Sequence, residues 1–146
     1  MEQKEIVECK REHLGMIQNI IIRMNSNSFT LKGISIGILT ACFGIYTANS
    51  TINNYILLLP IIPIVIMCFL DTYYLQLERK FRYIYDIIAT DIQKGTNQIE
   101  LYKMPIDKYD GNIDKKLGYF NSFCSKSIWM FYTVFILISV CAYICI

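Results

Sequence analysis

The charged residue best placed for chemistry is Asp71, because it directly follows an apolar run that begins near Tyr55. A carboxylate beside a membrane-length apolar segment is tolerated where it faces water or a basic partner. Repeated around an oligomer, such acids would form a ring at the mouth of a cation pore. The alternatives are a carboxylate wetted at the membrane surface or one paired with Lys32. Ser35 and Thr40 are further pore candidates, although such hydroxyls usually bond back to their own helix.

A basic cluster follows Asp71 and consists of Arg79, Lys80 and Arg82. Aromatic residues alternate with it, namely Phe81, Tyr83 and Tyr85. Such a cluster commonly attracts anionic lipid and fixes topology. It could also bind an anionic ligand such as a nucleotide, with cations on phosphate and rings under bases. Glu78 and Asp86 lie four residues before and after Arg82, so they compete for its charge.

The sequence offers no catalytic set. His13 is the only histidine and no nucleophile with an oriented base accompanies it, so we predict no enzyme and no catalytic residue. The six cysteines form no Cys-x-x-Cys pair, and we predict no metal and no cofactor. The formal net charge of +2 is too small for a general nucleic-acid-binding protein.

Three long apolar stretches must position these residues, at 29–48, 55–74 and 128–146. Each approaches the ~20 residues that a membrane helix requires. Hydrophobic residues make up 54% of the 146-residue chain, above the usual share in soluble domains. We therefore predict an all-α integral membrane protein with three transmembrane helices. Pro60 and Pro63 fall inside the second stretch and predict a bend there.

The distribution of Lys and Arg predicts the orientation. All basic residues lie either between the N-terminus and Lys32 or between Arg79 and Lys126. The positive-inside rule then places the N-terminus and the long loop in the cytoplasm and the C-terminus outside.

Both cytoplasmic parts carry helical patterns. After Leu70, apolar residues recur at spacings of four and three up to Ile88, so the second membrane helix should extend into the cytoplasm within a helix-and-loop region at 75–127. Residues 1–25 show the same spacing, interrupted by Lys10, and predict an amphipathic helix. We expect the two helices to pack together or with other subunits. Residues 25–28 (Asn-Ser-Asn-Ser) predict a break before the first membrane helix.

Small residues recur every fourth position in the first apolar stretch, at Gly33, Gly37 and Ala41, with Gly44 beyond them. Such spacing allows close approach of two helix backbones. The partner could be another helix of this chain or another subunit.

Three motifs give the chain a resemblance to a known group of proteins. They comprise His13 to Gln18 (HLGMIQ) with Arg23-Met24 and Asn27 to Gly33 (NSFTLKG), then Leu70 to Leu75 (LDTYYL), and then Glu78 to Arg82 (ERKFR) with Tyr85-Asp86. The chain resembles small bacterial three-helix membrane effectors that accompany nucleotidyltransferases in anti-phage defence, in particular Hailong-type ion channel effectors. The resemblance covers most of residues 13–86.

The resemblance implies a homo-oligomeric ion channel in the bacterial inner membrane, held closed by a cytoplasmic nucleotide or oligonucleotide and depolarising the membrane when open. A tetramer is the first hypothesis for its subunit number. The implied partners are the lipid bilayer and a nucleotidyltransferase or its oligonucleotide product. The alternative is a membrane-anchored adaptor or sensor subunit that conducts nothing.

Overall fold

Helices account for all the regular structure that the computed structural model describes, which covers residues 3–48, 53–95, 102–109, 111 and 114–145. The three long helices are α1 (Gln3–Ala48), α2 (Ile61–Lys94) and α4 (Lys126–Cys145). The short helices are η1 (Asn54–Leu57), η2 (Ile106–Lys108), η3 (Lys115–Leu117) and α3 (Tyr119–Phe123). Each long helix contains a stretch long and apolar enough to cross a membrane. The predicted all-α class with three such helices is confirmed.

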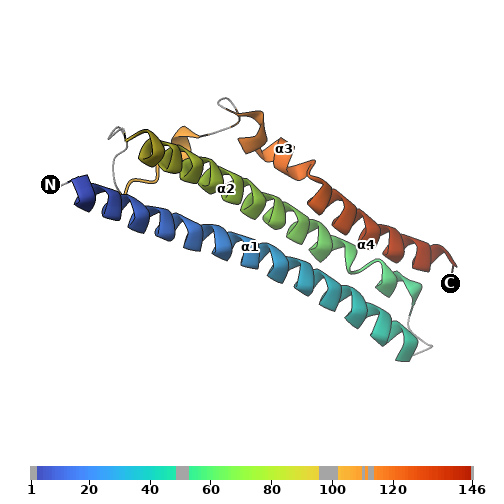
Figure 1. The fold of residues 1–146 in the computed structure, drawn as a ribbon. Helices are drawn as coiled ribbons and strands as arrows, with labels where there is room; N and C mark the ends of the chain where they lie inside the picture. Colours follow the sequence, from blue (N-terminus) through green and yellow to red (C-terminus); the bar gives the residue numbers. More distant parts are fainter. Residues whose placement is uncertain (1–2, 49–52, 96–101, 110, 112–113, 146) are drawn as a thin grey trace.

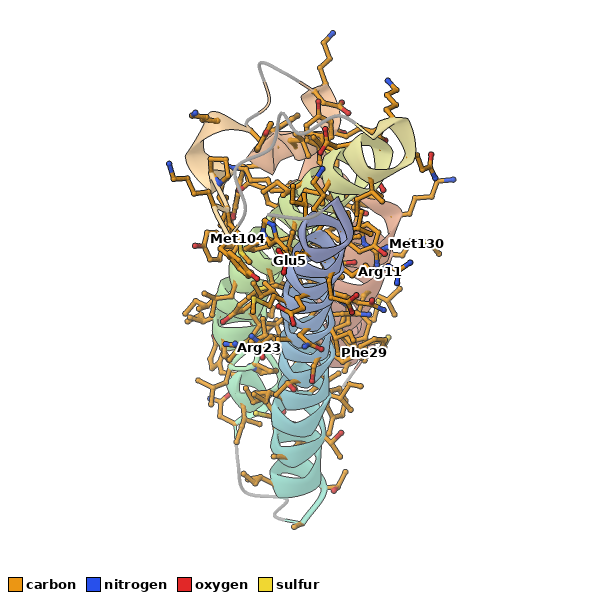
Figure 2. The ribbon with its side chains drawn as sticks, turned by 60° about the vertical axis from the view of Figure 1, so that its left-hand side comes forward. Glu5, Arg11, Arg23, Phe29, Met104 and Met130 are labelled. Atoms are coloured by element: carbon orange, nitrogen blue, oxygen red, sulfur yellow. The ribbon has the colours of Figure 1, made fainter. Side chains whose placement is uncertain are left out.

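The long helices lie side by side (Figure 1). α1 and α2 run antiparallel along most of their lengths, and α4 packs beside the first half of α2. The connection between the first two helices includes residues 49–52, which lie outside the described residues. Polar side-chain atoms are most abundant at the end of the molecule that carries Glu5 and Arg11 (Figure 2), which we call the charged end.

Two apolar clusters fill the space between the helices. At the charged end, Ile17 of α1 packs with three residues of α2, Phe81, Ile84 and Ile88. This cluster confirms that the two amphipathic segments pack together within one chain. At the other end, the second cluster joins α1, α2 and α4 through Leu39, Ile64, Ile128 and Tyr132. All eight residues are buried, so side chains occupy the centre of the bundle.

The predicted break at residues 25–28 is wrong, because α1 continues without interruption from Gln3 to Ala48. Inside a helix, Ser and Asn are each less favourable than Ala by only about half a kcal/mol. The Ser28 hydroxyl does not cap a new helix but donates to Asp71 of α2. Packing along α2 therefore outweighs the local preference for a break.

Pro60 and Pro63 lie where the second apolar stretch changes from η1 to α2. Pro60 is the N-cap of α2, and Pro63 lies in its first turn, where a backbone N–H would have no partner within the helix. The two prolines thus mark the start of α2. η1 precedes them, and the candidate membrane span Asn54–Lys94 includes both helices.

The predicted helical continuation of the second apolar stretch is confirmed. α2 continues from the apolar region to Lys94 and ends at Gly95. Gly95 adopts a φ of 65°, and its N–H bonds to the carbonyls of Asp91 and Ile92. This left-handed conformation suits glycine and closes the helix. One rigid helix therefore joins Asp71 to the charged end.

Candidate functional site

A buried ion pair joins α1 to α2 where the apolar stretches meet the charged end. The Lys32 Nζ atom lies 2.7 Å from the Asp71 Oδ2 atom. The Asp71 side chain is fully buried, and the Lys32 side chain is 16% exposed. Of the alternatives for Asp71, the geometry selects the pairing with Lys32.

Two hydroxyl groups complete the site. Ser28, one turn before Lys32, donates to Asp71 and accepts a 2.8 Å hydrogen bond from the Lys32 ammonium. The Tyr132 hydroxyl of α4 donates to the other Asp71 oxygen at 3.2 Å. The ammonium also lies 5.9 Å from the centre of the Phe131 ring, within the range of a cation–π contact. The Asp71 carboxylate therefore ties together all three long helices.

The site is a charged cluster that lies between the two apolar clusters of the bundle. A well-packed apolar pair of similar volume is often as stable as a buried ion pair or more so, whereas removing one partner leaves an unpaired buried charge. Charged groups at membrane depth are costly and commonly mark function. Packing alone therefore does not account for Lys32 and Asp71.

The other two pore candidates, Ser35 and Thr40, differ in burial. The Ser35 hydroxyl is buried and donates to the carbonyl of Leu31, and the exposed Thr40 hydroxyl donates to the carbonyl of Ile36. Both bond back to their own helix, as such hydroxyls usually do. Of these two residues, only Thr40 presents its side chain to the outside of the bundle.

The small-residue stripe is not packed against the other helices. A Cβ atom built on Gly33, Gly37 or Gly44 would meet no neighbouring atom within 4 Å, and Ala41 is exposed. Of the two partners that the sequence allowed, packing against this chain's own helices is therefore wrong for the glycines.

Arg79, Lys80 and Arg82, the basic cluster, make different contacts. The Arg79 guanidinium donates at 3.3 Å to the carbonyls of Lys116 and Asn121 and to the Ser122 hydroxyl, so it holds the segment around η3 and α3 against α2. Arg82 pairs with Glu78 at 2.7 Å, and its side chain is 60% exposed. Lys80 is half-buried, with no hydrogen bond or ion pair to the residues that the structure describes. The three residues do not converge on one point.

A groove near Arg82 was not apparent from the sequence. It lies between α1 and α2 with a volume of ≈ 460 Å³. Its polar lining comes from Gln18 and Asn25 of α1 and from Arg82 and Asp86 of α2, with Tyr85 beside them. It thus offers amide, cationic, anionic and aromatic groups together.

A second buried ion pair was also missed by the sequence analysis. Lys10 of α1 and Asp91 of α2 lie 2.6 Å apart at 4% and 6% exposure. The available signal was their place in the two apolar patterns, since Lys10 interrupts the first and Asp91 follows Ile88 by three residues. Charges at core positions usually pair.

His13 lies one turn from Lys10 and is fully buried, with the Tyr102 ring 5.8 Å away. Neither of its ring nitrogens has a hydrogen-bond partner in the described part of the protein. Burial without a partner lowers the pKa of His13 below its ordinary value of 6.5. His13 is therefore neutral at physiological pH.

Comparisons of the chain with protein-family models, curated proteins and solved structures give no match. The resemblance to Hailong-type effectors stays a prediction.

The ion pair can be tested with a double-mutant cycle. Lys32→Met or Asp71→Leu alone should destabilise the protein by about 3–5 kcal/mol, because each leaves a buried charge unpaired. The double variant should recover most of this loss. The measurement is the free energy of unfolding in mild detergent with increasing denaturant. Additive losses in the double variant would contradict the pairing.

His13 predicts a pH dependence of stability. Because its folded pKa is lowered, the unfolded chain binds the extra proton first as the pH falls below 6.5. The contribution of His13 to the free energy of unfolding is fully present above pH 6.5. It is lost as the pH falls toward the pKa of His13 in the folded protein. Between pH 7 and pH 5, the unfolding midpoint of His13→Met should fall less than that of the natural protein. Equal falls would contradict this, because they would show that His13 binds its proton equally well in the folded and the unfolded chain.

Proposed function

We propose that this protein is the subunit of a homo-oligomeric ion channel of the bacterial inner membrane, with the charged end in the cytoplasm. The observation that carries the proposal is the fully buried Asp71 carboxylate, held by Lys32 beside the apolar stretches. A stability argument does not explain this pair, whereas intramembrane carboxylates recur in ion pathways.

Several subunits are needed for a pore, because side chains fill the centre of a single bundle. The outward face of α1 is suited to assembly, since Gly37 and Gly44 leave its backbone accessible to another helix. Thr40 lies on the exposed surface of the same helix and supplies a hydroxyl. A tetramer remains the first hypothesis.

In our proposal the structure corresponds to the closed state. Lys32 neutralises Asp71, so the carboxylate cannot attract cations from the cytoplasm. Opening separates the pair and moves Asp71 to the mouth of the pore, where a ring of acids concentrates cations. Because α2 is one helix from Asp71 to Lys94, a displacement at the charged end would be transmitted to the carboxylate.

We assign the gating signal to the groove between α1 and α2. Arg82 could contact a phosphate, Tyr85 could stack on a base, and Gln18 and Asn25 could bond its polar edge. Glu78 and Asp86 offset the charge of Arg82, so base recognition must contribute more than phosphate attraction. Arg79 leaves the proposed ligand set because backbone carbonyls already occupy it.

The resemblance to Hailong-type effectors supports the biological setting. It implies anti-phage defence, with the signal made by a partner nucleotidyltransferase. Release of the signal would open the channel and depolarise the infected cell.

Expression of the protein without its signal should depolarise bacterial cells, measured with a potential-sensitive dye during induction. Gly37→Leu should abolish the depolarisation, because the larger side chain blocks helix contact between subunits while leaving open space within the chain. Gly15→Leu is the matched control, since Gly15 also has open space but lies outside the apolar stretch.

A non-conducting adaptor would give a different result. Neither the natural protein nor Gly15→Leu would then depolarise cells, although both reach the membrane. Depolarisation by Gly37→Leu equal to that of the natural protein, at equal expression, would instead refute the assembly role of α1.

A further inference from the structure

A cleft opens beside the Lys32–Asp71 pair, between α1, α2 and α4. It has a volume of ≈ 560 Å³, and Lys32 contributes to its wall. An ammonium group has three N–H donors. The Lys32 ammonium uses two of them on Asp71 and Ser28, and the structure assigns the third no partner among the described residues. The cleft therefore contains an incompletely bonded cation.

The polarity of the cleft changes in one direction on all three helices. Along α1, the wall changes from Asn25 and Ser28 to Gly33 and Ile36. The α4 wall changes from Ser127 in the first turn to Phe131 in the next. On α2, which runs the opposite way, it changes from Glu78 to Leu75. One end is thus polar and the other apolar, along the direction in which the helices would cross a membrane.

The cleft continues onto the surface of α4. An apolar groove there shares Ser127 and Phe131 with the cleft and extends over Met130, Val134 and Phe135. The exposed Lys126 lines its polar end. A second cation therefore lies next to the cleft, followed by an apolar surface running along the helix.

We infer that this cleft binds an anionic phospholipid, with the headgroup phosphate near Lys32 and Lys126 and an acyl chain along Phe131 and Val134. The inference goes beyond conduction and depends only on membrane insertion. A lipid here would contact all three helices next to Asp71 and would stabilise the closed arrangement.

Charge complementarity favours a lipid over a second copy of the chain. The acids that this chain carries near the level of Lys32 are Asp71 and Glu78, and both are already paired within the chain. A neighbouring subunit would therefore bring no free carboxylate to the cleft at that level. Phospholipids with anionic headgroups supply the missing charge from the cytoplasmic leaflet.

The test compares the lipids that the purified full-length protein retains in native mass spectrometry. The probes are dioleoyl phosphatidylglycerol and dioleoyl phosphatidylcholine, which have the same acyl chains but headgroups of different charge. The natural protein should retain the anionic lipid preferentially. Lys126→Gln should weaken its retention roughly fivefold, because one lysine near the headgroup is lost. The matched control Lys94→Gln, an exposed lysine at the far end of α2, should not.

A second variant tests lipid binding without changing any charged residue. Ile36→Trp fills the apolar end of the cleft from an exposed position and should also lower retention of the anionic lipid. Equal retention of both lipids by the natural protein would overturn the inference. Retention of inorganic phosphate equal to that of phosphatidylglycerol would also overturn it, because a free anion would then account for the binding. A change in oligomer mass for Ile36→Trp, with lipid retention unchanged, would show that a second copy occupies the cleft.

Discussion

The ion pair between Lys32 and Asp71 is the interaction on which the arrangement of the long helices depends. An unpaired buried charge would be costly, so Asp71 stays against Lys32, Ser28 and Tyr132 in this arrangement of the helices. These three residues come from α1 and α4. One carboxylate therefore fixes the relative position of all three long helices, and the arrangement cannot change without changing its surroundings.

A second constraint comes from the pair between Lys10 and Asp91. Lys10 and Lys32 are 22 residues apart (32 minus 10), and Asp71 and Asp91 are 20 apart (91 minus 71), which correspond to about 33 Å and 30 Å of helix. The two pairs therefore fix the same antiparallel register at two levels of the α1–α2 contact. The groove with Arg82 and Tyr85 lies between them. In our proposal, a ligand that changes the contact of α1 with α2 there acts on two helices that an ion pair joins on either side of the groove. The ion pair at Asp71 is the one that controls the ion path.

Local patterns were sufficient to predict the three apolar helices and the extension of α2, because length and apolar spacing are properties of contiguous residues. The break at residues 25–28 was wrong because the Ser28 hydroxyl bonds to Asp71, 43 residues later, which no local propensity describes. The role of Arg79 likewise depends on carbonyls of a distant segment. The pairing of Lys32 with Asp71 was among the predicted alternatives, because opposite charges beside two apolar stretches have few other partners. The groove required the register between α1 and α2, which neither pattern gives alone.

The most direct measurement of the central claim is the reversal potential of the purified protein in planar bilayers under a KCl gradient, compared between the natural protein and Asp71→Asn. If Asp71 lines the mouth of the open pore, the natural protein conducts with a preference for cations. Its reversal potential then lies toward the potassium equilibrium potential, and that of Asp71→Asn moves toward zero. No current from the natural protein, or the same reversal potential in a conducting Asp71→Asn variant, would contradict the account.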